Sequence, residues 1–346
     1  MNGLRIGFAY DEPVKQDRPD RVESVEAEYE DEYTLSWMRT TLQQVRVGLD
    51  PSPTLVVDLP WGPDILPRLT EADLDVIFNI TEATSGRNRE SLIPALAEAK
   101  GIPCIGTDAV GLGISLDKYL TKVIANHIGI PTPDFVKVDS VGQWEQFVPK
   151  LTKLRFPVIA KPNTGGTSMG IRSVSKTESL SELYDIAKWV LNRLGDSVLV
   201  EEFISGREFT VALLARPKLE VLPIAEICFD DGSPNSFYSY EVKSNDWEEV
   251  VCPANPPGDT ADLMTDYACR VFKALGCRDM ARVDFRVSSD GVPYFLEINP
   301  LPGLSPYYSV FPIQAQAAGI SPEDIIHQLI HNALTRSPKG GIIRGI

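Results

Sequence analysis

The segment of residues 281–303 constrains the fold more than any other stretch of this chain. Two short apolar runs, residues 283–287 and 293–298, flank the turn sequence Ser-Ser-Asp-Gly of residues 288–291. An Asp-Gly pair between two alternating runs is a strong signal for a β-hairpin. We therefore expect two antiparallel strands joined by a tight turn.

Each strand of this hairpin carries one acid, Asp284 in the first and Glu297 in the second. Asn299 follows Glu297 by two residues, so both side chains point to one side if the strand continues. Three hard oxygen ligands on rigid strands suit Mg²⁺, which shares its remaining positions with water and phosphate oxygens. Arg282 precedes the acids, and Gly303, whose bare backbone N–H can approach a ligand, follows them. The alternative is a surface hairpin with solvated acids, and the motif alone leaves both open.

Charge and cysteine content limit the classes of partner. The length of 346 residues is enough for two or three domains. The net charge of −15 argues against nucleic acid or an anionic membrane as the partner. The five cysteines, an odd number without a CxxC pair, favour a reduced compartment. With no signal peptide and no apolar run of about 18 residues, we expect a soluble, cytoplasmic protein.

The N-terminal third alternates strand and helix patterns. Apolar runs predict four strands, at residues 4–10, 54–59, 75–81 and 102–106. The apolar positions within residues 15–45 predict one amphipathic helix, and a later helix is expected to begin near Ser115. This alternation indicates an open parallel sheet. The first strand is not followed by GxGxxG, which argues against a nicotinamide dinucleotide site.

A glycine-rich turn is the second informative feature. A strand predicted at residues 156–162 continues into Asn-Thr-Gly-Gly-Thr-Ser-Met-Gly, residues 163–170, before a return strand at 171–174. The backbone N–H groups of such a loop can bind phosphates. Lys161 on the strand, and Lys118 near a helix start, could reach phosphates as point charges. A flexible hairpin with surface lysines is the alternative, since the loop lacks the Walker pattern GxxxxGK[ST].

Acids also follow the next apolar strand, predicted at residues 197–204. Glu201 and Glu202 lie near its end, and Glu208 comes shortly after it. Such acids could accept hydrogen bonds from an adenine amino group or from a ribose. The alternative is an exposed strand end.

Together, these motifs resemble in order and spacing the ATP-grasp superfamily, and specifically the D-alanine–D-alanine ligase family. The resemblance extends over about residues 100–335, with further matching segments at residues 205–211, 240–243, 252–254, 275–277 and 314–319. It implies an α/β protein with a three-domain ATP-grasp fold. The implied domains are an N-terminal open parallel-sheet domain (1–117), a central α+β lid domain (118–201) and a C-terminal catalytic domain (202–346). ATP would lie between the last two, and the protein would be a homodimer.

The resemblance also implies roles for single residues. Lys118 and Lys161 would bind the phosphates of ATP. The glycine-rich loop, which includes Gly165, Gly166, Thr167 and Ser168, would close over these phosphates. Adenine and ribose binding falls to Glu201, Glu202, Ile204 and Glu208. Two Mg²⁺ ions, with Mn²⁺ as a substitute, would bind Asp284, Glu297 and Asn299. An oxyanion hole would use Arg282 and the Gly303 N–H, and Lys243 would reach the transferred phosphate.

The chain departs from the family in its amino-acid sites. The family's Gly-Gly-x-Ser-x-Glu turn after the first strand is replaced by Ala-Tyr-Asp-Glu-Pro, which offers Asp11 and Glu12 instead. The family's His-Gly…Gly-Glu-Asp-Gly segment is also replaced, and Glu82 and Arg89 become candidate substrate residues there. Ser309 is the candidate for the family's carboxylate-binding serine. The ATP-binding residues therefore match the family, whereas the substrate sites differ.

The resemblance implies an ATP-dependent carboxylate–amine ligase. Such an enzyme joins an amino acid or small carboxylic acid to an amino acid through an acyl phosphate, and releases ADP. The resemblance leaves open whether the product is D-alanyl-D-alanine or the product of another substrate pair. The alternative is an ATP-binding regulatory module or pseudoenzyme, which would have no use for the oxyanion-binding Arg282.

Overall fold

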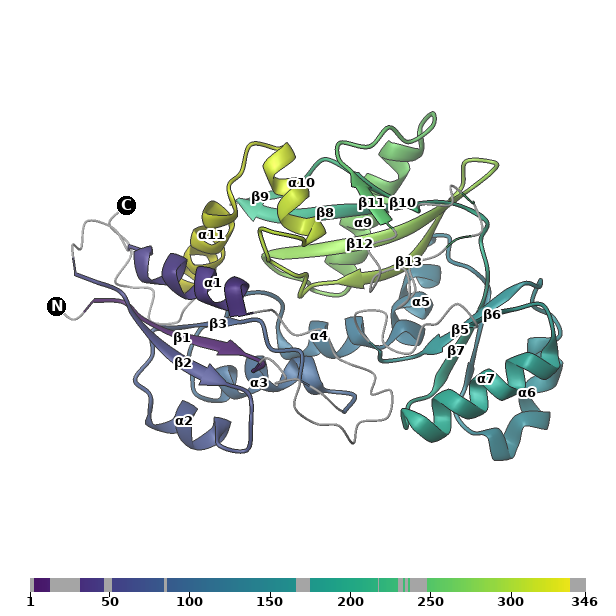
Figure 1. Ribbon diagram of the computed structural model, residues 1–346, viewed down its shortest axis with the longest axis horizontal. Helices are drawn as coiled ribbons and strands as arrows, with labels where there is room; N and C mark the ends of the chain where they lie inside the picture. The colour runs from purple at the N-terminus through teal and green to yellow at the C-terminus, as the bar shows by residue number, and fades with distance from the viewer. Residues whose placement is uncertain are drawn as a thin grey trace.

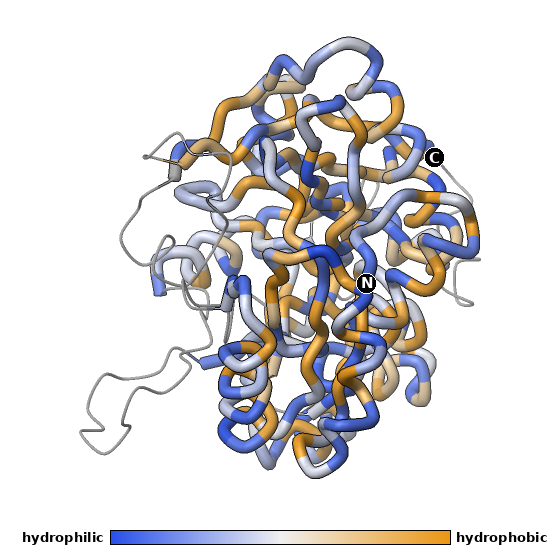
Figure 2. The backbone as a smooth tube through the Cα atoms, turned by 90° about the vertical axis from the view of Figure 1, so that its right-hand side faces the viewer, coloured by the Kyte–Doolittle hydropathy of each residue, from blue (hydrophilic) through white to orange (hydrophobic). Residues whose placement is uncertain are grey.

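The computed structural model describes residues 3–12, 32–46, 52–83, 86–165, 175–216, 218–229, 233, 236 and 248–336. In these ranges the strands form three sheets, each packed against helices (Figure 1). Hydrophobic stretches run mainly through the interior of the molecule, and many hydrophilic segments lie at its outer turns (Figure 2). Among the described helices, none is long and apolar enough to cross a membrane.

The N-terminal sheet is parallel, as predicted. It contains β1 (Arg5–Tyr10), β2 (Leu55–Pro60) and β3 (Val76–Asn79) in the order β2-β1-β3. Its helices are α1 (Glu32–Gln44), α2 (Ile65–Glu71), the 3₁₀ turn η1 (Arg89–Ser91), α3 (Leu92–Ala99) and α4 (Ala109–Leu116). Of the helix predicted over residues 15–45, residues 15–31 lie outside the described ranges. The described part places Leu35, Met38, Leu42 and Val45 in the core, as expected.

The fourth strand predicted at residues 102–106 is reduced to a single bridge between Cys104 and Ile77. Pro103 has no N–H to give to a ladder. Gly106 then takes a left-handed conformation, with φ of 77°, and donates its N–H to the Asp279 carboxylate at 2.7 Å. The segment therefore leaves the sheet after Ile105, and the prediction of a full strand was wrong.

The second sheet is antiparallel and carries two helices on one face. Its strands are β4 (Phe135–Val138), β5 (Val158–Pro162), β6 (Lys176–Thr177) and β7 (Val198–Glu202), in the order β4-β7-β5-β6. The helices are α6 (Trp144–Leu151), preceded by η2 (Val141–Gln143), and α7 (Leu180–Arg193). These elements share one apolar core. The predicted return strand at 171–174 lies outside the described residues.

The third sheet holds the predicted hairpin at its edge. Its strands are β8 (Gly206–Arg216), β9 (Lys218–Val221), β10 (Ala225–Phe229), β11 (Glu248–Val251), β12 (Met280–Ser288) and β13 (Pro293–Asn299). Their order is β11-β10-β8-β12-β13, and β9 also pairs with β8. The helices α9 (Thr260–Ala274), α10 (Val310–Ala317) and α11 (Pro322–Thr335) pack around it. The pairing of β12 with β13 confirms the hairpin.

The helix expected near Ser115 is two helices. α4 ends at Leu116, and α5 (Lys118–His127) begins after Asp117, whose carboxylate accepts the Leu120 N–H at 3.1 Å. This cap restarts the helix at Lys118. α5 lies centrally among the three sheets (Figure 1) and buries Ala125 in the core of the third. The domain limits at 117/118 and 201/202 stay a prediction.

Candidate active site

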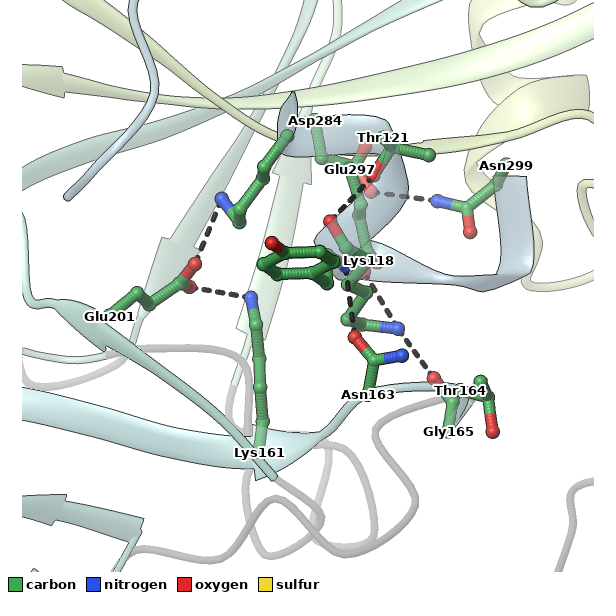
Figure 3. Close-up of polar contacts among 12 residues, drawn as sticks. Lys118, Thr121, Lys161, Asn163, Thr164, Gly165, Glu201, Asp284, Glu297 and Asn299 are labelled. Carbon is green, nitrogen blue, oxygen red and sulfur yellow. Dashed lines mark hydrogen bonds and ion pairs between the residues drawn. The ribbon is translucent and has the colours of Figure 1, made fainter. Parts of the chain in front are cut away.

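The two hairpin acids stand directly opposite each other. Asp284 of β12 pairs with Glu297 of β13, and Arg282 pairs with Asn299. Directly opposed residues present their side chains on the same face of a sheet. The amide nitrogen of Asn299 donates to Asp284 at 3.0 Å (Figure 3). The three predicted metal ligands therefore lie together, with the amide oxygen of Asn299 left for another partner.

The predicted oxyanion arginine lies in the same cluster. Arg282 donates to both oxygens of Asp284, at 3.0 Å from Nε and 3.1 Å from Nη2. Gly303 is exposed, in the loop that follows β13. Arg282 is thus adjacent to the acids, as expected, and its guanidinium is paired with one of them.

Lys118 connects the hairpin to the glycine-rich turn. Its ammonium lies 3.2 Å from Glu297 Oε2 and donates to the Gly165 carbonyl at 2.5 Å (Figure 3). Burial alone would raise the pKa of Glu297, but the charges of Lys118, Lys161 and Arg282 lower that pKa to about 2. Glu297 is therefore a fixed negative charge in the centre of the site.

A second charged cluster lies on the β5–β7 pair. Glu201 of β7 has one carboxylate oxygen 2.6 Å from Lys161 and the other 2.8 Å from Lys122. All three side chains are buried. Burial would raise the pKa of Glu201, but the two lysines lower it, so the carboxylate stays charged. Lys122 was missed by the sequence reasoning, although it lies one helical turn after Lys118, on the same face of α5.

Two further acids were predicted to bind the nucleotide, and they lie in different surroundings. Glu208 of β8 faces Arg286 at 3.3 Å, and burial, together with Asp284 and Glu297, raises its pKa to about 7. Glu202 alternates to the other face of β7 and accepts the Arg155 N–H at 2.7 Å, so its carboxylate lies apart from Glu201.

Ile204 is buried just after β7. Gly166, Thr167, Ser168 and Lys243 lie outside the described residues.

Asn163 holds the start of the glycine-rich turn in place and was not predicted. Its amide nitrogen donates to Asp117 at 2.8 Å, and its amide oxygen accepts the Tyr119 N–H at 2.9 Å. Its carbonyl accepts the Lys118 N–H at 3.0 Å. One side chain thus ties the turn to the beginning of α5 (Figure 3). Its position after Pro162 gives no signal for this role, because the partners are distant in sequence.

The N-terminal candidates meet beyond the carboxyl ends of β1 and β3. One oxygen of Asp11 accepts the N–H groups of Glu82 and Ala83, at 2.8 and 3.1 Å. Ala83 has a left-handed φ of 54°, a rare conformation for a residue with a side chain. Burial raises the pKa of Asp11, and the charge of Arg89 opposes that rise.

Arg89 extends from η1 to the glycine-rich turn. It is 5% exposed, donates to the Thr164 carbonyl at 2.6 Å and pairs with Glu90 at 3.2 Å. Its buried Nε has no hydrogen-bond partner in the described structure. Arg89 is therefore a buried cation whose Nε–H is unpaired among the described residues.

Ser309 is the N-cap residue of α10, and its side chain makes no capping hydrogen bond. A hydroxyl group at a helix N-terminus is well placed for an anion, because the free N–H groups there favour negative charge.

Comparisons with known proteins agree with this architecture. The sequence model of the family described as "D-ala D-ala ligase C-terminus" matches residues 124–331. The uncharacterized protein y4sG of Sinorhizobium fredii is 33% identical over 290 residues, which cover 81% of this chain and 80% of that protein. The D-alanine–D-alanine ligase of Ruminiclostridium cellulolyticum is 34% identical over 280 residues, covering 79% and 72%. A crystal structure of D-alanine–D-alanine ligase from Bacillus anthracis complexed with ATP matches with a TM-score of 0.74 at 24% identity, over 99% of this chain and 100% of that one.

Fold, site and comparisons define this chain as an ATP-grasp ligase, an ADP-forming enzyme that makes an amide bond. Within that class, it belongs to the D-alanine–D-alanine ligase family. The match to the family's sequence model begins at residue 124, so the N-terminal third of the chain, with Asp11 and Arg89, lies outside that match.

Proposed function

We propose that this enzyme activates the carboxylate of an amino acid or small acid as an acyl phosphate and transfers the acyl group to the amine of an amino acid. The observation that carries the proposal is the convergence of Lys118, Lys161 and Glu297 between the second and third sheets. Two lysines and a carboxylate held charged at one place suit a nucleotide with its metal ions. ATP would lie between these sheets.

The hairpin residues fit Mg²⁺ by the chemistry of their donors. Two carboxylates and an amide oxygen are hard ligands on rigid strands. Within the described ranges, no three His, Cys, Asp or Glu side chains gather as a metal cluster. The proposed set therefore depends on Asn299 and on phosphate oxygens to complete it. When bound, Mg²⁺ would neutralise the charge that develops on the phosphates.

The nucleotide-binding roles follow from position. Lys118 and Lys161 would hold phosphates as point charges. Glu201 and Glu208 would accept hydrogen bonds from the adenine amino group and the ribose. Ile204, with Glu202 beside it in sequence, would line the adenine site, and the glycine-rich loop would cover the phosphates. Lys243 would reach the transferred phosphate.

The reaction would proceed in two displacements. A carboxylate oxygen of the first substrate attacks the γ-phosphorus, and the bond to the ADP oxygen breaks. The amine nitrogen of the second substrate then attacks the acyl carbon, inorganic phosphate leaves, and the amine loses a proton. Arg282, after leaving Asp284, and the Gly303 N–H would stabilise the tetrahedral oxyanion between these events. Because an acyl phosphate hydrolyses, the site must exclude water.

The first substrate would bind beyond the carboxyl ends of β1 and β3. In the order β2-β1-β3, β2 pairs with one side of β1 and β3 with the other, so the order of strands changes direction at β1. Ligands of open parallel sheets bind at such switch points. Oδ2 of Asp11 accepts both backbone N–H groups, which leaves Oδ1 for an amine, and the unpaired Nε–H of Arg89 could donate to a carboxylate. Glu82 lies in the same loop, and Ser309 would hold the carboxylate of the second substrate.

The test is ADP release from Mg-ATP with amino acids and small acids, singly and in pairs. We expect release with a pair that contains one carboxylate donor and one amine donor. ATP binding without ADP release under any pair would instead favour a regulatory module. A homodimer, a cytoplasmic location and the three domain limits given above remain part of the proposal.

A further inference from the structure

Lys122 is a fully buried cation near this site, with three oxygen partners from different parts of the chain. Its side chain is fully buried on α5. Its ammonium faces three oxygens: Glu201 Oε2 at 2.8 Å, the Thr132 hydroxyl at 2.9 Å and the Phe295 carbonyl at 3.3 Å. The contacts with Thr132 and Phe295 are hydrogen bonds, and the contact with Glu201 is an ion pair. The Thr132 hydroxyl itself donates to the Phe295 carbonyl at 2.9 Å, which fixes this group further.

Lys161 approaches the same carboxylate in a different way. Its ammonium lies 2.6 Å from Glu201 Oε1, and Glu201 is its one ion-pair partner among the described residues. A lysine that binds a phosphate must direct its ammonium to that phosphate. When ATP binds, its phosphates therefore compete with Glu201 for this ammonium, and Lys161 exchanges part of its contact with Glu201 for contact with the nucleotide.

When Lys161 turns towards the nucleotide, the Glu201 carboxylate loses one of its two cations. Glu201 is buried, and a buried carboxylate without a cation is strongly unfavourable. A second cation that stays in place removes the difficulty. Lys122 is that cation, because its three partners come from β7, from the segment before β4 and from β13, and hold it from three sides.

We propose that Lys122 is a positioning residue that neutralises Glu201 and so releases Lys161 to bind the phosphates of ATP. The proposal rests on the proposed function, since it assumes ATP between the second and third sheets. It assigns different tasks to two lysines on one carboxylate: Lys122 holds it permanently, and Lys161 pairs with it when no nucleotide is bound.

The test compares ATP and adenosine binding in Lys122→Met, with adenosine measured by competition against a fluorescent ATP analogue. Without Lys122, Glu201 retains Lys161, and the phosphates lose a ligand. The Kd for ATP should rise at least about tenfold, the worth of one hydrogen bond to a charged group, whereas the Kd for adenosine should change little. Asn126→Met, an exposed position on the same helix, is the matched control and should bind both as the wild type does.

A second variant tests the charge argument and guards against poor folding. Lys122→Met/Glu201→Gln removes the carboxylate that would hold Lys161, so its ATP affinity should return to that of Glu201→Gln alone. Equal losses for ATP and adenosine in Lys122→Met, or a double variant that binds ATP more weakly than Glu201→Gln alone, would overturn the proposal. Wild-type protein that does not bind ATP would instead refute the proposed function, which separates the two failures.

Discussion

Asp284 stands opposite Glu297 in the β12–β13 pair, and each is already matched to a cation. Arg282 donates to Asp284 with two hydrogen bonds, and Lys118 lies 3.2 Å from Glu297. Both acids are therefore held in position by cations without a metal. A metal ion entering between them would replace these cations, which frees Arg282 and Lys118 for the substrates.

Removing either acid should stop turnover without unfolding the protein. Asp284→Asn and Glu297→Gln keep the shape of the side chain but replace a negatively charged metal ligand with a neutral amide, and the charge stabilisation that a metal supplies amounts to several kcal/mol. We expect ADP release to fall by a factor of about 100 or more, with an unchanged far-UV circular dichroism spectrum. Asp290→Asn, on the exposed hairpin turn, is the control. Full activity in either variant would refute the metal assignment.

Arg282→Met should slow the chemical step more than it weakens nucleotide binding. The loss of an oxyanion donor typically costs about 2.7–4 kcal/mol, so kcat should fall by about 100- to 1,000-fold. The Kd for ATP should stay close to the wild-type value, because Lys118 and Lys161 remain. A variant whose only defect is a raised Kd for ATP would show that Arg282 holds the nucleotide and not the oxyanion.

Arg89→Met should weaken the first substrate specifically. A hydrogen bond to a charged group is worth about 1.5–3 kcal/mol, so we expect the KM for the carboxylate substrate to rise about 10- to 100-fold. The KM for the amine substrate should change far less. Arg68→Met, an exposed arginine on α2, serves as the control. Equal effects on both substrates would place the defect in the glycine-rich turn that Arg89 also contacts.

Gly206→Ala should destabilise the third sheet. Gly206 has a φ of 152°, and an added Cβ would lie 1.9 Å from the Val287 carbonyl oxygen, a backbone atom that cannot move aside. We expect the free energy of unfolding to fall by about 2 kcal/mol or more, as for other overpacked sites. Urea unfolding of this variant and of Gly62→Ala, where a Cβ meets nothing within 4 Å, makes the comparison. Equal stability of the two would show that the sheet can adjust.

The parts predicted well from the sequence are those set by local pattern. The hairpin was placed because Asp290 and Gly291 specify a turn and because a period of two aligns Glu297 with Asn299. The direct opposition of Asp284 to Glu297 depends on a register shift between Asp284 and Phe285, which the turn length alone does not predict. The restart of the helix at Lys118 was missed, although Asp117 is a typical N-cap residue.

The long-range contacts could not be predicted from one sequence. The ion pair between Lys122 and Glu201 joins residues far apart in the chain, and no local pattern separates Lys122 from a surface lysine. The same holds for Asn163 and for the contact of Arg89 with Thr164. These contacts arise where the second sheet meets the others, so only the assembled fold reveals them.

The most direct test of the account is ADP release from Mg-ATP by the wild-type protein against a panel of L- and D-amino acids and small acids, singly and in pairs. The account predicts ADP release that requires a carboxylate donor, depends on Mg²⁺, and accompanies an amide product when an amine donor is present. ADP release with D-alanine alone would show that this enzyme keeps the substrate specificity of its family. ADP release only with another pair would show a different specificity, for which Asp11 and Arg89 are the first residues to examine. Tight ATP binding with no ADP release under any combination would contradict it.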